Sequence, residues 1–382
     1  MPLIRNVLTP RVAGHLLLGW VGWIALQSTS AILPDPLAAP MLFGILAAII
    51  AVIVVCAFGV VTQAERLAHR LGDPYGTLVL TLSIVVIEVV LISAVMLGPG
   101  DHQTIARDSV MAVAMIILNL VVGVALIIGG TRHVRLQLNR TGASSYLAVL
   151  VVMLCVAFGL PHVIGDERVY SSTQALLVAA CTLVMYGFFL YRQMGAQRGD
   201  FQEVTSGHPS TRTVTPDTQQ SLTSITQVLA EHRSEILARA IVLVLTVIPI
   251  VLLSHDMAAL LDEGLGRLGA PTSLSGLLIA AIVFLPETIT VIRAAASGEI
   301  QRMSNLCHGA LVSTVGLTIP TVLTIGLFTG QPVVLAETPG NLMLLAVTLL
   351  TSMASMLGKF VTPLHGAAHL MIFMLYLLVV FA

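Results

Sequence analysis

Charged residues are scarce in this chain. Asp, Glu, Lys and Arg make up 10% of its 382 residues, and the net charge is −1. Nucleic-acid-binding proteins carry a basic face, so this balance argues against a nucleic-acid partner. Hydrophobic residues make up 57% of the chain, and the mean hydropathy is +0.97. This composition is typical of an integral membrane protein, whose first partner is the lipid bilayer.

Motifs of catalysis and of resident metal sites are also missing. The chain has no GxSxG and no HExxH motif, so we expect that it is not an enzyme and that it has no cofactor. Its four cysteines lie in apolar runs without CxxC or zinc-like spacing, and we expect them to be buried thiols. The first apolar run lacks the features of a cleavable signal peptide, so we expect it to remain as a helix.

Long apolar runs dominate what is present. Runs of about 17–25 apolar residues are the signal of membrane-spanning helices. The eleven predicted helices are Val12–Leu33, Met41–Gln63, Pro74–Leu97, Ser109–Gly130, Ser144–His162, Ser171–Tyr191, Ile236–His255, Thr272–Ala294, Met303–Thr329, Asn341–Leu357 and Gly366–Phe381. The sequence therefore predicts an all-α integral membrane protein with about 11 transmembrane helices.

The basic residues predict how these helices are oriented. With a cytoplasmic N-terminus, fifteen of the 18 Lys and Arg residues fall in cytoplasmic segments, and only Arg107, Arg168 and Arg267 fall in external ones. Cytoplasmic loops of membrane proteins are enriched in Lys and Arg. We therefore expect a cytoplasmic N-terminus and, because the number of helices is odd, an external C-terminus.

One long polar stretch, Gly195–Glu235, divides the apolar chain. It is rich in Ser, Thr, Gln and Pro, which predicts a cytoplasmic linker. The helices then group as one extra N-terminal helix in residues 1–35, five helices in 36–192, the linker in 193–235 and five helices in 236–382. Because five is odd, equivalent helices of the two groups cross the membrane in opposite directions. This is the topology of two inverted five-helix repeats.

Two of the apolar runs carry a glutamate at a similar depth. Glu88 lies fourteen residues after Pro74, and Glu287 lies fifteen residues after Thr272. A charged residue inside the bilayer costs roughly 2.5–3.5 kcal/mol on insertion scales, so it is rare and usually functional. One such glutamate can serve helix packing alone. A matched pair in two repeats instead predicts a duplicated ion-binding element near the midplane of the membrane.

Each glutamate run is followed by a run rich in small and polar residues. The first of these carries Asn119, and the second carries Ser313 and Thr314. Their side-chain oxygens are of the kind that hard cations bind. Hydrogen bonding within or between helices is the competing interpretation for all three.

Three histidines in the second half are open to more than one interpretation. His308 lies in the same run as Ser313, where a packing role competes with a proton-carrying role. His365 and His369 are four residues apart, which is a metal-ligand spacing, but their HGAAH sequence lacks the glutamate of HExxH. For this pair we favour an interfacial position or a weak pH sensor over a metal site.

Four segments resemble the calcium/cation antiporter superfamily, and specifically its bacterial ChaA-type cation/proton antiporters. They are Gly72–Leu97, Met115–His133, Leu285–Ala295 and Asn305–Pro320. The resemblance implies two inverted five-helix repeats plus one extra helix. It also implies that Glu88 and Glu287 face each other at mid-membrane and bind the metal cation or protons in alternation. Asn119, with Ser313 or Thr314, would then lie beside them.

The residues before the glutamates differ from one pattern in this superfamily. Many vacuolar-type relatives have Gly-Asn-Ala-x-Glu, whereas here Val85–Ile87 and Phe284–Pro286 precede the glutamates. The acidic site is therefore barer, and Ca²⁺, Na⁺ and K⁺ all stay open as the cation. The implied function is a transporter of the bacterial plasma (inner) membrane that exchanges cytoplasmic cations for external protons. The alternative is a passive cation channel, although the sequence shows no filter loop.

Overall fold

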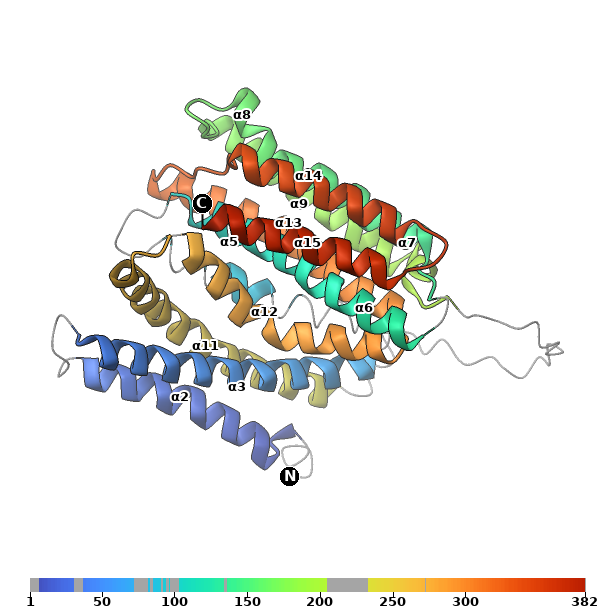
Figure 1. Cartoon of the computed structure of the whole chain (residues 1–382). Helices are drawn as coiled ribbons and strands as arrows, with labels where there is room; N and C mark the ends of the chain where they lie inside the picture. The colour runs from blue at the N-terminus through green and yellow to red at the C-terminus, as the bar shows by residue number, and fades with distance from the viewer. Residues whose placement is uncertain are drawn as a thin grey trace.

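Helices make up almost all of the structure (Figure 1). The computed structural model describes residues 7–30, 37–71, 82, 85–90, 92–93, 96, 103–133, 136–204, 233–271 and 273–381. Within these ranges, the only extended pairings are isolated bridges of Val169 with Asp166 and with Val334. The predicted all-α class is confirmed.

The helices are α2 (Pro10–Ser30), α3 (Ala39–Leu71), α5 (Ile105–Met115), η1 (Ile116–Val121), α6 (Val122–Arg132), α7 (Arg140–Leu154), η2 (Cys155–Gly159), α8 (Pro161–Ile164), α9 (Ser172–Met194), η3 (Arg198–Phe201), α11 (Arg233–Leu268), α12 (Ser273–Ala296), α13 (Ile300–Thr329), α14 (Pro339–Met356) and α15 (Pro363–Val380). The segments η1 and η2 are wide π-helical turns inside longer helices, and η3 is a short 3-10 helix.

Nine helical stretches in the described part of the chain are long and apolar enough to span a membrane. They are Ala39–Leu67, Ile105–Arg132, Arg140–Ile164, Ser172–Met194, Arg233–Leu268, Leu274–Ala296, Ile300–Thr329, Pro339–Met356 and Pro363–Val380. The predicted run Val12–Leu33 corresponds to the 21-residue helix α2. Most of the run Pro74–Leu97 lies outside the described residues, but residues 85–90 within it are helical. Together these make the eleven helices that the sequence predicts.

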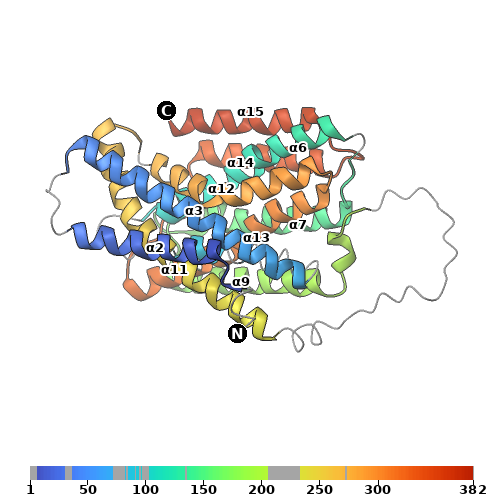
Figure 2. The ribbon, with the colours of Figure 1, turned by 90° about the horizontal axis from the view of Figure 1, so that it is seen from below.

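The two repeats are interleaved. The first helices of the repeats, α3 and α11, pack along each other, and α2 lies beside them along one side of the molecule (Figure 1). The last helix of the first repeat, α9, packs against α13 of the second. The last helix of the second repeat, α15, packs in turn against α6 of the first (Figure 2). A pseudo-two-fold relation between two five-helix groups produces this reciprocal packing.

The direction of the helices fits inverted repeats. At the face where α9 ends and α11 begins, which we call the linker face, His133 after α6 bonds the carbonyl of Ala296 at the end of α12, at 2.9 Å. Since α6 and α12 both end at this face and α13 begins there, α13 runs opposite to α6. The other face of the bundle is the opposite face, where α13 ends and α14 begins.

The beginning of the predicted linker packs on the helices at the linker face. Residues 198–201 form η3, and Phe201 is buried against the ring of Tyr146, 5.1 Å away between centroids. The amide of Asn305 also donates to the carbonyl of Phe201 at 2.6 Å. Residues 205–232 of the predicted linker lie outside the described residues, and its last three residues, Arg233–Glu235, form the start of α11.

Two glycines bring α6 and α15 into backbone contact. A Cβ atom added to Gly366 would lie 2.5 Å from the carbonyl oxygen of Gly123, and one added to Gly123 would lie 2.9 Å from the carbonyl of Gly366. Small residues let membrane helices approach this closely. The contact fixes α15 against the span that contains η1.

The predicted burial of the cysteines is wrong for two of the four. Cys56 and Cys307 are buried, whereas Cys155 and Cys181 are exposed on the outside of the bundle, and all four are free. Many large apolar side chains, such as Phe188 and Leu350, share this outward position. A membrane helix has no need to hide apolar groups from lipid, so an apolar run does not predict burial inside the protein.

Candidate functional site

Glu88 lies in the interior of the bundle and is held by one hydrogen bond. Its side chain is buried, and Oε2 accepts a hydrogen bond of 2.6 Å from the hydroxyl of Thr314 on α13. No described residue bonds Oε1, which is also buried. The helix that carries Glu88 is thereby joined to the second repeat, with one carboxylate oxygen left to bind another ligand.

Glu287 lies near the middle of α12 and is less well satisfied. It is 4% exposed, and neither carboxylate oxygen has a hydrogen-bond partner among the described residues. A small cavity with room for about one water molecule adjoins it. Ile117 and Val121 of η1 form one wall of this cavity, and Leu306, Cys307 and Ala310 of α13 form another.

Both glutamates lie beside α13 in the interior of the bundle. Glu88 accepts a hydrogen bond from Thr314 of α13, and Leu306, Cys307 and Ala310 of the same helix border the cavity beside Glu287. Buried polar groups in proteins are nearly always hydrogen-bonded, because an unsatisfied one costs about 1–3 kcal/mol and a charged one more. Three buried carboxylate oxygens that no described residue bonds therefore make this region the candidate for a ligand site.

Another carboxylate lies toward the linker face from this site. Thr290, nearly one turn beyond Glu287 on α12, donates a 3.4 Å hydrogen bond to Oε1 of the half-buried Glu65 on α3. The same hydroxyl lies 3.2 Å from the carbonyl of Pro286. The contact ties α3 to the helix that carries Glu287.

Thr314 and Ser313 are adjacent in sequence but serve different neighbours. Thr314 is fully buried and bonds Glu88, whereas the hydroxyl of Ser313 accepts a 3.1 Å hydrogen bond from Tyr186 on α9. The resemblance left Ser313 and Thr314 as alternatives. Of the two, the structure brings Thr314 to the glutamates.

Asn119 lies in η1, and its side chain bonds two helices of the second repeat. Its Nδ2 donates to the hydroxyl of Thr348 on α14 at 2.9 Å, and its Oδ1 lies 3.3 Å from Nδ1 of His369 on α15. The residue is fully buried. No hydrogen bond between Asn119 and either glutamate occurs among the described residues. Asn119 is predicted to lie beside the site, and the structure brings it near only because its neighbours Ile117 and Val121 in η1 border the cavity beside Glu287.

The three histidines have separate environments. His365 caps the first turn of α15, where its side chain accepts from the backbone of Thr362, while His369 is buried. Their i, i+4 spacing therefore does not produce a shared metal site. His308 bonds Ser304 on its own helix and stacks on Tyr146, with ring centroids 5.9 Å apart. Across the described residues, no three His, Cys, Asp or Glu side chains are grouped so that they could hold a metal ion.

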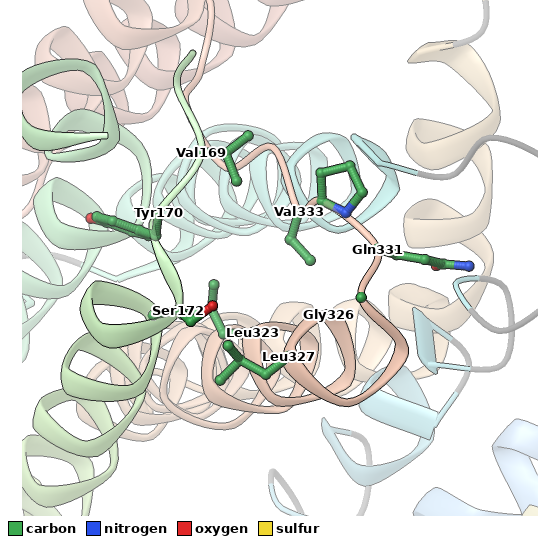
Figure 3. Close-up of a pocket in the computed structure, with 11 residues that line it drawn as sticks. Val169, Tyr170, Ser172, Leu323, Gly326, Leu327, Gln331 and Val333 are labelled. Atoms are coloured by element: carbon green, nitrogen blue, oxygen red, sulfur yellow. The ribbon is translucent and has the colours of Figure 1, made fainter. Parts of the chain in front are cut away.

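A second cavity, larger than the one beside Glu287, lies apart from the glutamates. It has a volume of about 220 Å³ and lies at the opposite face, between the start of α9 and the end of α13 (Figure 3). Apolar side chains such as Val169, Leu323 and Val333 border it together with the polar residues Tyr170, Ser172 and Gln331. No carboxylate is among the residues that line it.

An acidic residue that sequence reasoning did not single out is buried at the opposite face. Glu337, just before α14, has a fully buried side chain that accepts from the backbone of Thr338 and the amide of Asn341, at 2.8 and 2.9 Å. Burial raises the pKa of Glu337, while these hydrogen bonds and the charge of Arg107 oppose the rise. No hydropathy signal could have found this residue, because it lies between two predicted helices.

The chain is similar to known membrane transporters. The sequence profile described as "Sodium/calcium exchanger protein" matches residues 41–195 and 239–382. The chain is 33% identical over 326 residues to the putative ionic transporter y4hA of Sinorhizobium fredii, covering 84% of each chain. It is 31% identical over 329 residues to the sodium-potassium/proton antiporter ChaA of Escherichia coli, covering 85% of this chain and 86% of that one.

Solved structures of exchangers share the fold. Native YfkE matches with a TM-score of 0.69 at 16% identity, covering 97% of this chain and 98% of that one. The H⁺/Ca²⁺ exchanger CAX matches with a TM-score of 0.67 at 15% identity, covering 97% and 89%. The family profile covers most of the chain, and it agrees with the relatives and with the fold. The protein therefore belongs to the sodium/calcium exchanger family and resembles its ChaA-type cation/proton antiporters.

Proposed function

We propose that the protein is a secondary active transporter that exchanges Ca²⁺, Na⁺ or K⁺ for protons at a site formed by Glu88 and Glu287. The observation that carries the proposal is the set of three buried carboxylate oxygens, one on Glu88 and two on Glu287, that no residue in the described part of the chain bonds. The ChaA relative is a sodium-potassium/proton antiporter, which supports cation/proton antiport as the activity.

The chemistry of exchange follows from competition for these oxygens. Two neighbouring carboxylates in a low-dielectric interior repel each other when both are ionised. Either a bound cation or a bound proton relieves this repulsion, so each ligand displaces the other. Exchange results when the site opens to only one side of the membrane at a time. Thr314 would hold the ionised Glu88 in place through its hydroxyl.

Orientation and location form part of the proposal. The distribution of Lys and Arg supports a cytoplasmic N-terminus and linker and an external C-terminus. The bacterial relatives support the plasma (inner) membrane as the location. If this orientation is right, a reporter enzyme that works only outside the cytoplasm should be active when it is fused after Ala382. Activity of a reporter enzyme that works only in the cytoplasm, fused at the same place, would refute the orientation.

The test is dequenching of a ΔpH-sensitive dye in everted membrane vesicles after addition of Ca²⁺, Na⁺ or K⁺. We expect cation-dependent dequenching in the wild type and its loss in Glu88→Gln and Glu287→Gln. Glu263→Gln is the matched control, because Glu263 is exposed near the end of α11 and forms an ion pair with Arg267 of the same helix. Full exchange by both site variants would overturn the proposal, and cation flux without proton coupling would establish a channel.

A further inference from the structure

The interior of the bundle holds a second polar cluster that the exchange chemistry does not use. It consists of Asn119 on η1, Thr348 and Ser355 on α14, and His369 on α15. Each of these four side chains is at most 1% exposed. A polar, ionisable residue at this depth in a membrane protein is rare unless it has a function.

His369 is the centre of this cluster, and both of its ring nitrogens are engaged. Nδ1 lies 3.3 Å from Oδ1 of Asn119, and Nε2 lies 3.0 Å from the hydroxyl of Ser355. Because the amide nitrogen of Asn119 donates to Thr348, its oxygen is the acceptor and Nδ1 carries the proton. The hydroxyl of Ser355 lies beside Nε2 and donates to the carbonyl of Thr351 on its own helix at 2.6 Å. No carboxylate among the described residues bonds the ring.

The segment that this cluster holds is a π-helical turn. η1 covers Ile116–Val121 between the α-helical segments α5 and α6. Such turns are rare, and within α-helices they occur frequently at functional sites. A wide turn is less regular than an α-helix, so contacts from its side chains matter more for its position.

The same turn forms a wall of the small cavity beside Glu287. Ile117 and Val121 border the cavity beside Glu287, and Asn119 lies midway between them in sequence. Two residues along a helix correspond to roughly half a turn, so Asn119 projects from the side of η1 away from that cavity. Any movement of Asn119 toward or away from His369 thus moves the cavity wall by a comparable amount.

We infer that His369 is a positioning residue of the exchanger, which holds Asn119 and through it places η1 against the Glu287 cavity. The inference rests on the proposed two-glutamate function, and it means that a residue on α15 helps to determine the cation affinity of that site. His369 itself touches neither the cation nor the exchanged proton. Its loss therefore weakens cation binding, while at saturating cation the dependence of exchange on pH stays that of the wild type.

Two conservative substitutions separate the two contacts of the ring. The amide of an asparagine at position 369 can occupy the place of Nδ1 and keep the bond to Asn119. The amide of a glutamine reaches the place of Nε2 and keeps only the bond to Ser355. We expect His369→Asn to retain a near wild-type KM for the cation. We expect His369→Gln and His369→Leu to raise it severalfold, because η1 is then held less firmly against the cavity beside Glu287, with little change in maximal rate.

The measurement is KM, maximal rate and pH midpoint of cation-driven dequenching in proteoliposomes, using the cation that the wild type transports. His365→Gln is the matched control, because His365 lies one turn earlier on α15 and caps only its own helix. It should behave as wild type. Thr348→Val, which removes the other bond to Asn119, should also raise KM.

The outcomes distinguish this inference from the proposed function. If His369→Gln keeps the wild-type KM, or if His369→Asn is impaired as strongly as His369→Leu, the positioning role is wrong. A pH midpoint that is shifted at saturating cation in His369→Asn and His369→Gln would make His369 a proton carrier instead. In each of these cases the wild type still exchanges and still depends on Glu88 and Glu287. Failure of the proposed function, in contrast, would appear in the glutamate variants themselves.

Discussion

The hydrogen bond from Thr314 to Glu88 offers a sharp test of the site. Thr314→Val replaces the hydroxyl by a methyl group of similar size, so it removes the 2.6 Å bond without leaving a cavity. Because Thr314 is fully buried, water does not readily replace the lost donor. The ionised Glu88 then has no described hydrogen-bond partner at either oxygen.

The magnitude follows from the charge of the acceptor. A hydrogen bond to a charged group contributes about 1.5–3 kcal/mol, and a factor of ten in affinity corresponds to about 1.4 kcal/mol. The cation binds the ionised carboxylate, so weaker stabilisation of that form weakens cation binding. We expect KM for the cation to rise roughly ten- to hundred-fold in Thr314→Val. Thr314→Ser keeps the hydroxyl and should stay within about threefold of the wild type.

The assay is the initial rate of cation-driven dequenching against cation concentration in proteoliposomes that contain equal amounts of folded protein. Thr318→Val is the matched control. Thr318 is also fully buried and lies one turn further along α13, but its hydroxyl has no hydrogen-bond partner among the described residues. A wild-type KM in Thr314→Val, or the same loss in Thr318→Val, would refute the reasoning.

Two further predictions concern stability. Gly366→Ala places a Cβ atom 2.5 Å from the carbonyl oxygen of Gly123, so we expect the free energy of unfolding to fall by about 1–3 kcal/mol and Tm in detergent to be lower. Gly187→Ala is the control, because the space around Gly187 is open, and it should not lower Tm. Equal Tm values for the two variants would exclude tight α6–α15 packing. Burial raises the pKa of Glu337, so the stability that this group contributes is fully present below the ordinary Glu pKa and is lost as pH rises through the higher folded value. The Tm of Glu337→Gln relative to wild type should therefore increase as the pH rises above the ordinary Glu pKa of about 4, and a constant or falling difference would show that Glu337 ionises freely in the folded protein.

Much of the fold follows from hydropathy alone. Nine of the eleven predicted helices correspond to apolar spans in the described part of the chain, because a spanning helix must be apolar over its whole length. The predicted ends differ most for Ile236–His255, which the structure extends to Arg233–Leu268 in α11. Its polar last turns, near Asp262 and Glu263, continue the helix beyond the apolar run. Hydropathy reports where lipid begins and not where a helix ends.

The site was only partly accessible from the sequence. Glu88 and Glu287 stood out because a carboxylate in an apolar run is unusual, and both are buried in the structure. The partners of Asn119 could not be predicted, since Thr348 and His369 lie 229 and 250 residues away on other helices. The spacing of His365 and His369 suggested a common face. It did not show that one residue caps the helix while the other bonds η1, which depends on how α15 meets α6.

The interleaving of the repeats has a consequence for biosynthesis. The ribosome produces Asn119 long before Thr348 and His369, so the first half of the chain enters the membrane with this amide unpaired. The partner of Glu88, Thr314, is likewise 226 residues away and belongs to the second half. A nascent first half is therefore an assembly intermediate whose polar interior is completed only when the last two helices arrive. Premature termination after the linker would leave a membrane-inserted fragment with unsatisfied polar groups, which is a natural substrate for membrane quality control.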